Sequence, residues 1–183
     1  MRDEIENLIA SVAPYDKMEQ EHITNTLLWI RSKAEIFRLK KPDTPPKHLV
    51  SYFVLVDKKK RKLLLINHIK TGLWLPPGGH VENNEHPADT VKREIQEELG
   101  IKALFIFDDP FFITVTKTVN IDAGHTDVSL WYLLKGDMLK KLEYDKSEMN
   151  GYRWFSFEEI LQLAMNKCDP HMHRFTNKLL NSV

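Results

Sequence analysis

Residues 79–101 read GHVENNEHPADTVKREIQEELGI, and the interpretation of the whole chain starts from this stretch. Pro87 suits the first turn of a helix, and Gly100 suits the position where a helix stops. Between them, apolar residues recur at helical spacing, at Ala88, Val91, Ile95 and Leu99. The stretch therefore predicts a short helix with one apolar face that packs on a sheet.

The other side of this predicted helix carries carboxylates. Glu94, Glu97 and Glu98 stand at positions i, i+3 and i+4, so their side chains project from a common side. Like charges this close repel one another unless a cation lies between them. Mg²⁺ and Mn²⁺ are hard cations that take oxygen ligands, so the pattern favours a divalent-metal site.

The full spacing in this stretch is G-x5-E-x7-R-E-U-x-E-E-x-G-U, where U is aliphatic, and every fixed position is matched. This pattern resembles the signature of the Nudix hydrolases. An isolated E-x-x-E-E is more often a solvated acidic helix face, and the additional matched positions favour the metal site. The resemblance covers roughly residues 48–165 and implies an α/β fold, the Nudix α/β/α sandwich with a mixed sheet.

The resemblance also implies which groups act. Mg²⁺ or Mn²⁺ is expected to be bound by the carboxylates of Glu94, Glu97 and Glu98 and by the backbone carbonyl of Gly78. Glu94 or Glu97 is expected to double as the general base. An ion pair between Arg93 and Glu85 would orient the ligands in a catalytic supporting role, although a purely structural pair is the alternative.

The implied reaction is hydrolysis of a phosphoanhydride bond. A diphosphate linkage is heavily anionic and repels hydroxide, whereas a metal withdraws charge from it and lowers the pKa of a bound water. A carboxylate can then take the proton from that water. The expected substrate is a nucleoside diphosphate linked to a group X, such as a nucleoside triphosphate or a related nucleotide derivative.

Four further residues are candidates for substrate binding: His80, His125, Asp127 and Glu148. His80 follows a double glycine and could contact a phosphate, although a loop-surface histidine is the default. His125 and Asp127 open a predicted strand that could face the nucleotide cleft. Glu148 could be a base from a late loop, or an exposed loop charge.

The N-terminal part is predicted to be a helical extension. Residues 1–40 look helical, with Asp16 and Glu19 spaced as a capping box. The proline-rich segment 41–47 ends this region, which predicts an extension at 1–44 and a Nudix domain at 45–183. The extension predicts a homodimer through the N-terminal helices or a lid. A simple stabilising cap docked on the main domain is the alternative, and the sequence leaves all three open.

Beyond residue 47 the pattern changes to short β-prone runs. Strands are expected at His48–Val56, Lys62–His68, Leu73–Leu75, Phe111–Val119, Asp127–Leu134 and Tyr152–Phe155. The segment 76–79 is expected to be a loop. Ser156 and Glu159 form a capping box that opens a helix of about ten residues, and residues 171–181 are expected to form a last helix.

Composition excludes several classes of protein. Lys+Arg and Asp+Glu both total 26, and the formal net charge of +0 argues against a nucleic-acid partner. No apolar run approaches the roughly 20 residues of a membrane span, and the N-terminus lacks the apolar core of a signal peptide. The single cysteine, Cys168, suits a reducing compartment, so a cytoplasmic protein with no membrane partner is expected.

Other functions and the identity of X stay open. A catalytically silent nucleotide-binding or sensing module would typically have lost a motif glutamate. Isopentenyl diphosphate isomerase, a relative, needs a cysteine in the core domain, whereas Cys168 falls beyond the expected sheet. The tyrosine associated with dinucleoside polyphosphate cleavage is missing between Tyr52 and Tyr132. Thr116 stands where ADP-ribose-cleaving members often have proline, so a small nucleoside triphosphate or an uncommon derivative is favoured.

Overall fold

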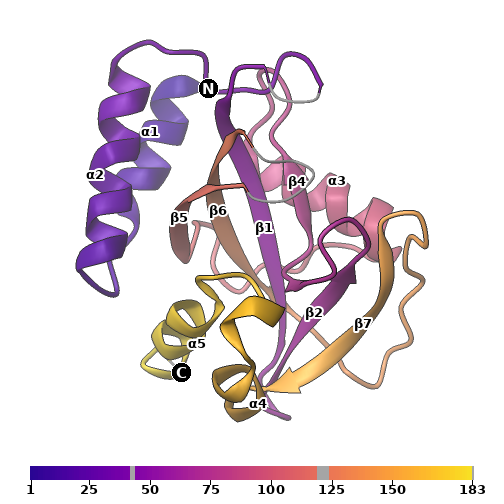
Figure 1. Cartoon of the computed structure of the whole chain (residues 1–183). Helices are drawn as coiled ribbons and strands as arrows, with labels where there is room; N and C mark the ends of the chain where they lie inside the picture. Colours follow the sequence, from indigo (N-terminus) through magenta and orange to yellow (C-terminus); the bar gives the residue numbers. More distant parts are fainter. Residues whose placement is uncertain (42–43, 119–123, 183) are drawn as a thin grey trace.

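The computed structural model describes residues 1–41, 44–118 and 124–182, which form a mixed sheet flanked by helices (Figure 1). The strands are β1 Lys47–Asp57, β2 Lys62–His68, β3 Trp74–Leu75, β4 Gly78–His80, β5 Phe112–Lys117, β6 Thr126–Lys135 and β7 Met149–Ser156. Their order is β3-β2-β1-β6-β5, with β4 paired to β1 and β7 paired to β2. β1 and β6 run parallel and the other pairs run antiparallel, so the predicted mixed sheet is confirmed.

The helices lie on both faces of the sheet. They are α1 Arg2–Ser11, α2 Lys17–Arg31, α3 Pro87–Leu99, α4 Phe157–Gln162 and α5 Met172–Leu180, with a 3-10 turn at Met165–Lys167. Alternate side chains of β1 point to opposite faces. Leu49 and Phe53 share one apolar cluster with the α3 residue Ile95, whereas Val54 packs with Phe175 of α5 in the other cluster. The α/β/α sandwich is thereby confirmed.

Helix α3 begins and ends where the sequence predicts. Its N-cap is His86, whose Nδ1 accepts a hydrogen bond from the Ala88 N–H at 3.2 Å. At the other end Gly100 takes the left-handed conformation, with φ 66°, which glycine adopts without steric cost. The predicted apolar face is confirmed, since Val91, Ile95 and Leu99 are fully buried. Each such side chain stabilises the fold by about 1.5–3 kcal/mol.

Two expectations about local structure are wrong. Residues 1–40 are helical only at 2–11 and 17–31, and Pro14 separates the two helices because it removes a backbone donor and restricts the residue before it. The second helix ends at Arg31, and Lys33 has a positive φ of 61° that an α-helix does not accept. The expected loop at 76–79 instead contains the start of β4, because Gly78 and Gly79 come close enough to β1 to pair with it.

The helix after Ser156 is also shorter than expected. The capping box is present, but α4 ends at Gln162 because Leu163 takes an extended conformation. The chain then turns so that Cys168 forms a β-bridge with Trp74. The last strand starts earlier than predicted, at Met149, and Val119 of the predicted fifth strand lies outside the described residues.

The N-terminal helices cover the edge strand β5 through one buried carboxylate. Glu19 is fully buried, and its Oε1 accepts hydrogen bonds from the Ile113 N–H at 3.2 Å and from Lys178 Nζ at 2.9 Å. The other oxygen accepts from the Tyr15 N–H at 2.6 Å. A free strand edge is a site for unwanted pairing. Glu19 therefore joins α2, an edge strand and α5.

A second contact joins the same elements nearer the surface. Arg174 donates two hydrogen bonds to Asp16, from Nε at 2.8 Å and from Nη2 at 2.6 Å. The apolar residues Ile5, Ile9, Ile23 and Ile30 are also buried within this chain. The division at residue 44 and the homodimer both stay predictions. None of the helices in the described part of the chain is long and apolar enough to cross a membrane.

We expect Glu19→Ala to lower the free energy of unfolding by about 3–5 kcal/mol, because it leaves Lys178 as a largely buried charge without its counter-ion. Urea denaturation measures this. Removing both charges in Glu19→Met/Lys178→Met should recover part of the loss. The control is Glu21→Ala, whose side chain is 58% exposed and which should cost under about 0.5 kcal/mol. Equal losses at the two positions would contradict the assigned role of Glu19.

Hydrogen bonds from Arg174 lower the pKa of Asp16 from 3.8 to about 2. A lowered folded-state pKa means that the pair stabilises the fold above pH 4 and that this contribution is lost as the pH falls toward 2. Because Asp16 is one-third exposed, we expect a loss of about 1–2 kcal/mol. In Asp16→Asn, which keeps a good N-cap, unfolding curves at several pH values should lack this component. Asp3→Asn, at an exposed position of α1, should retain it.

Candidate functional site

Three of the motif glutamates lie on α3: Glu98 is buried, Glu94 is half-buried and Glu97 is near the surface. The Glu98 residue is only 4% exposed, whereas the Glu97 side chain is 61% exposed. Within the described part of the chain, Glu98 Oε2 is shielded from solvent and has no hydrogen-bond partner. Burial, together with the charges of Glu94 and Glu148, raises the pKa of Glu98 well above its usual range. Burial also raises the pKa of Glu94, against the opposing effect of Arg93.

The glycines of β4 lie directly against these carboxylates. A Cβ atom on Gly79 would come within 1.9 Å of Glu94 Oε1, so a larger residue fits there only if the Glu94 carboxylate moves. Gly78 has a φ of +148°, and a Cβ there would meet the Ser51 carbonyl oxygen at 2.2 Å. Ser51 pairs with Gly79 across the strands and donates a hydrogen bond to the Pro87 carbonyl at 2.9 Å. The start of α3 and β4 are thus held on the same segment of β1.

Arg93 connects the loop before α3 to the glutamates. It donates two hydrogen bonds to Glu85, from Nε at 3.0 Å and from Nη2 at 3.1 Å. Its Nη1 donates to Glu94 Oε1 at 2.6 Å and lies 3.6 Å from Glu97 Oε2. Burial alone would raise the pKa of Glu85, but hydrogen bonds from Arg93 and from the loop lower it. The predicted contact between Arg93 and Glu85 is present, and its role in catalysis stays a prediction.

Glu148 lies immediately before β7. Its backbone carbonyl accepts a hydrogen bond from the Ile69 N–H at 3.0 Å, which fixes it next to the end of β2. Its side chain is exposed, and its charge raises the pKa values of both Glu94 and Glu98. This coupling indicates that the Glu148 carboxylate lies near the glutamates of α3. Its assignment as a base or a substrate contact is untested.

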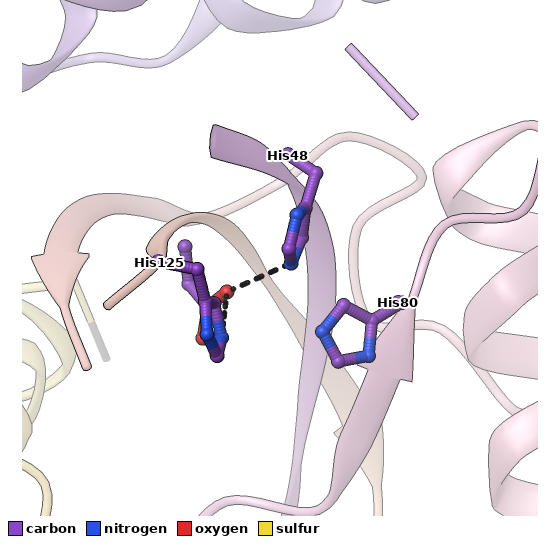
Figure 2. Close-up of side chains that lie close together, drawn as sticks. His48, His80 and His125 are labelled. Atoms are coloured by element: carbon purple, nitrogen blue, oxygen red, sulfur yellow. Dashed lines mark ion pairs between the residues drawn. The ribbon is translucent and has the colours of Figure 1, made fainter. Parts of the chain in front are cut away.

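The other predicted substrate residues lie on the opposite face of the sheet. His80, His125 and Asp127 gather with His48, and Figure 2 shows the three histidine rings converging from different strands. Sequence reasoning missed His48. The parallel register that sets it opposite Asp127 could have revealed it, but a register is not readable from one strand alone. Burial, with the charge of Arg38 next, lowers the pKa of His80 to about 3.

A pocket of about 260 Å³ borders His80. The segment after α2 lines one side of it with Arg38, Lys40 and Lys41, and Val81 and Glu82 line the other. Three cationic side chains make this pocket suited to an anion. Through this pocket, the end of the predicted N-terminal extension lies next to His80, one of the predicted site residues.

Donor chemistry at the glutamates fits a hard divalent cation. Carboxylate oxygens are the preferred ligands of Mg²⁺ and Mn²⁺. Glu98 Oε2 is a buried, unpaired oxygen, and such an atom is costly unless a cation or a hydrogen-bond donor satisfies it. Gly79 leaves the space that keeps Glu94 beside it. The arrangement can therefore bind a dication, with the carboxylates placed close to an anion that binds next to it.

Comparison with known proteins agrees with this fold and arrangement. The model of the NUDIX domain matches residues 46–175. The chain belongs to the Nudix hydrolase family. An uncharacterized Nudix hydrolase, YvcI of Bacillus subtilis, is 30% identical over 119 residues, which cover 64% of this chain and 72% of the Bacillus protein. The asymmetrical bis(5'-nucleosyl)-tetraphosphatase of Sus scrofa is 36% identical over 97 residues, 51% of this chain and 63% of the pig protein.

Solved structures show the same fold at lower identity. A binary complex of the Ap4A hydrolase of C. elegans superposes with a TM-score of 0.61 and 19% identity, covering 73% of this chain and 96% of that one. The dihydroneopterin triphosphate pyrophosphohydrolase of E. coli gives a TM-score of 0.60 at 12% identity, covering 82% and 100%. At such identities the likeness shows the fold alone.

We expect Gly79→Ala to displace the Glu94 carboxylate, because the new Cβ would occupy its position. A misplacement of about 1 Å at a reacting centre can cost about 10²-fold in rate, so Mn²⁺ affinity and turnover should both fall strongly. Calorimetric Mn²⁺ titration measures the first without a known substrate. Gly136→Ala, which introduces a clash with Trp154 at 2.5 Å outside the glutamate cluster, is the control. Unchanged Mn²⁺ binding in Gly79→Ala would refute the assigned role of β4.

Proposed function

We propose that this protein catalyses the metal-dependent hydrolysis of a phosphoanhydride bond in a nucleoside diphosphate linked to a group X. The observation that carries the proposal is the buried, unpaired Glu98 Oε2 beside Glu94, on a helix with the complete family motif. A purely structural acidic helix would not place a buried carboxylate beside a half-buried one. The cost of that burial favours a site that a cation completes.

Glu94, Glu97, Glu98 and the carbonyl of Gly78 would hold the cofactor, which we propose to be Mg²⁺ or Mn²⁺. When bound, the metal would withdraw charge from the diphosphate and favour ionisation of the attacking water. The three carboxylates would tie the cofactor to α3 and the Gly78 carbonyl would tie it to β4, and both elements contact β1 at Ser51.

The side chains have separate tasks in this proposal. Glu94 or Glu97 takes a proton from the attacking water. Arg93 holds Glu94 in place, and Glu85 in turn holds Arg93 through its paired hydrogen bonds. Such fixed partners keep a reactive carboxylate in one orientation, which reduces the reorganisation needed during reaction. Glu148 is the alternative base, supported by its charge coupling to Glu94 and Glu98.

The substrate class is proposed to be a small nucleotide. The pocket beside His80 contains the cationic side chains of Arg38, Lys40 and Lys41, which would favour binding of an anionic group of the substrate. Sequence features favour a nucleoside triphosphate or related derivative, whereas the pig relative is a bis(5'-nucleosyl)-tetraphosphatase. Both substrates contain the linkage that the site would cleave. A homodimer through the N-terminal helices remains part of the proposal, and so does a cytoplasmic location, which the single cysteine supports.

The test is a substrate panel with Mg²⁺ or Mn²⁺: nucleoside triphosphates, dinucleoside tetraphosphates, ADP-ribose and nucleotide sugars, with product analysis by chromatography. We expect turnover of at least one, abolished by chelator. Glu98→Gln should lower kcat/KM at least about 100-fold, because even loss of a ligand's hydrogen-bond partner often costs about 10–100-fold. Glu158→Gln, an exposed position on α4, should retain activity.

The outcomes separate the two candidate functions. Folded protein that turns over none of these substrates would contradict catalysis and favour the silent nucleotide-binding module. Turnover that survives both Glu98→Gln and Glu97→Gln would contradict the metal site on α3.

A further inference from the structure

A cluster of three histidines and one aspartate lies on the sheet face that looks away from α3 (Figure 2). His48 is at the start of β1 and pairs in register with Asp127 of β6. His80 ends β4 and pairs with Val50, two residues beyond His48, so alternation places it on the same face. His125 immediately precedes β6. One potential ligand atom from each of the four lies within 4.8 Å of all the others.

The hydrogen bonds around His48 fix which nitrogen faces the cluster. Its Nδ1 lies 2.8 Å from the Pro45 carbonyl oxygen, which can only accept, so Nδ1 carries the proton. Nε2 therefore presents a lone pair. This atom is buried and has no hydrogen-bond partner among the described residues, although Asp127 Oδ1 lies only 3.4 Å away.

The ring of His125 also reaches the cluster. The Thr118 hydroxyl lies 3.1 Å from the His125 carbonyl oxygen and 3.2 Å from its ring nitrogen Nδ1. On the other side of the ring, His125 Nε2 lies 3.2 Å from Asp127 Oδ1. The lone pair of His48 Nε2 and the same carboxylate oxygen therefore face each other in a largely buried space. Such an arrangement is repulsive unless a cation lies between the atoms.

Protonated rings would be the alternative source of positive charge. His48 and His125 are stacked with ring centroids 5.0 Å apart, so two imidazolium charges would lie side by side in a buried space. Each ring would also need a good hydrogen bond from Nε2, which His48 lacks. A single divalent ion satisfies all these atoms at once.

The donor set and spacing indicate the class of ion. Three imidazoles and one carboxylate suit Zn²⁺ and its transition-metal neighbours, whereas Mg²⁺ prefers oxygen ligands alone. Tetrahedral Zn²⁺ with bonds of about 2.0–2.1 Å sets its ligand atoms about 3.3–3.4 Å apart. The separations of Asp127 Oδ1 from His48 Nε2 and from His125 Nε2, 3.4 Å and 3.2 Å, match that spacing. The other ligand atoms lie within 4.8 Å of one another, so they would move closer together around the ion. The carbonyl of Pro45 and the hydroxyl of Thr118 orient the rings, as partners of metal-bound histidines do.

We propose a second metal site, separate from the glutamates of α3, in which one Zn²⁺ ion is bound by His48, His80, His125 and Asp127. Four protein ligands close the coordination shell, so the ion has a structural role. It ties together the start of β1, the end of β4 and the start of β6. Because β4 also carries Gly78 and Gly79, the ion stabilises the strand on which the glutamate site rests.

The experiment uses the whole chain, stripped of metal and held in excess Mg²⁺ so that the oxygen-rich site is occupied. Co²⁺ serves as the probe, because tetrahedral Co²⁺ absorbs much more strongly in the visible range than octahedral Co²⁺. We expect one equivalent of tetrahedral Co²⁺, displaced by one equivalent of Zn²⁺, and a higher thermal unfolding midpoint with Zn²⁺. His48→Gln and Asp127→Asn should each lower Zn²⁺ affinity at least about tenfold.

Matched variants separate this site from the glutamates and from other histidines. His173→Gln and Glu98→Gln should leave Zn²⁺ affinity unchanged. An octahedral Co²⁺ spectrum, or affinity unaffected by His48→Gln and Asp127→Asn, overturns the proposal. So does Zn²⁺ binding that is lost in Glu98→Gln, which would place the ion on α3.

A readout on the unmodified protein covers the case in which a variant fails to fold. Long-range ¹H–¹⁵N spectra report the ring nitrogens of each histidine directly. Addition of Zn²⁺ should shift the Nε2 signals of His48 and His125 together with a ring nitrogen of His80. Shifts confined to the other histidines, or no shifts, overturn the proposal and leave the proposed hydrolysis untouched.

Discussion

The structure depends on the close approach of β4 to both β1 and α3. Gly78 and Gly79 have no side chain, and either added Cβ would overlap a neighbouring atom, on β1 in one case and on Glu94 in the other. This approach lets the carboxylates of α3 lie against backbone instead of solvent. The buried Glu98 and the half-buried Glu94 thereby lie close together, and ionising both is costly unless a dication lies beside them. The apolar face of α3 supplies the stabilisation that holds them there, since Val91, Ile95 and Leu99 are fully buried.

Much of this could be predicted because it is local. The ends of α3, its apolar face and the spacing of Glu94, Glu97 and Glu98 follow from helical periodicity and from the preferences of proline and glycine. The Arg93–Glu85 contact also spans one helix and its preceding loop. The capping box at Ser156 is likewise a local pattern, and it forms as expected.

The parts that could not be predicted depend on pairing between distant segments. Glu19 fits a helix N-terminus in the sequence, yet its side chain bonds to an edge strand and to α5, 94 and 159 residues away. The short strand β4 has no apolar alternation, because glycines pair with β1 through backbone alone. His48 comes next to Asp127 only because β1 and β6 pair in parallel in this register. Sequence periodicity carries no information about which strands become neighbours.

Strand alternation explains how one segment can serve both faces of the sheet. In β4 the residue Gly79 faces α3, whereas the next residue, His80, faces the cluster formed with His48, His125 and Asp127. The backbone carbonyl of His80 also accepts a hydrogen bond from Arg93 at 3.2 Å, so the two faces share a mechanical connection. Any force that fixes the His80 ring also fixes the backbone beneath Glu94. The His80 backbone thus helps to hold Arg93, which in turn donates a hydrogen bond to Glu94.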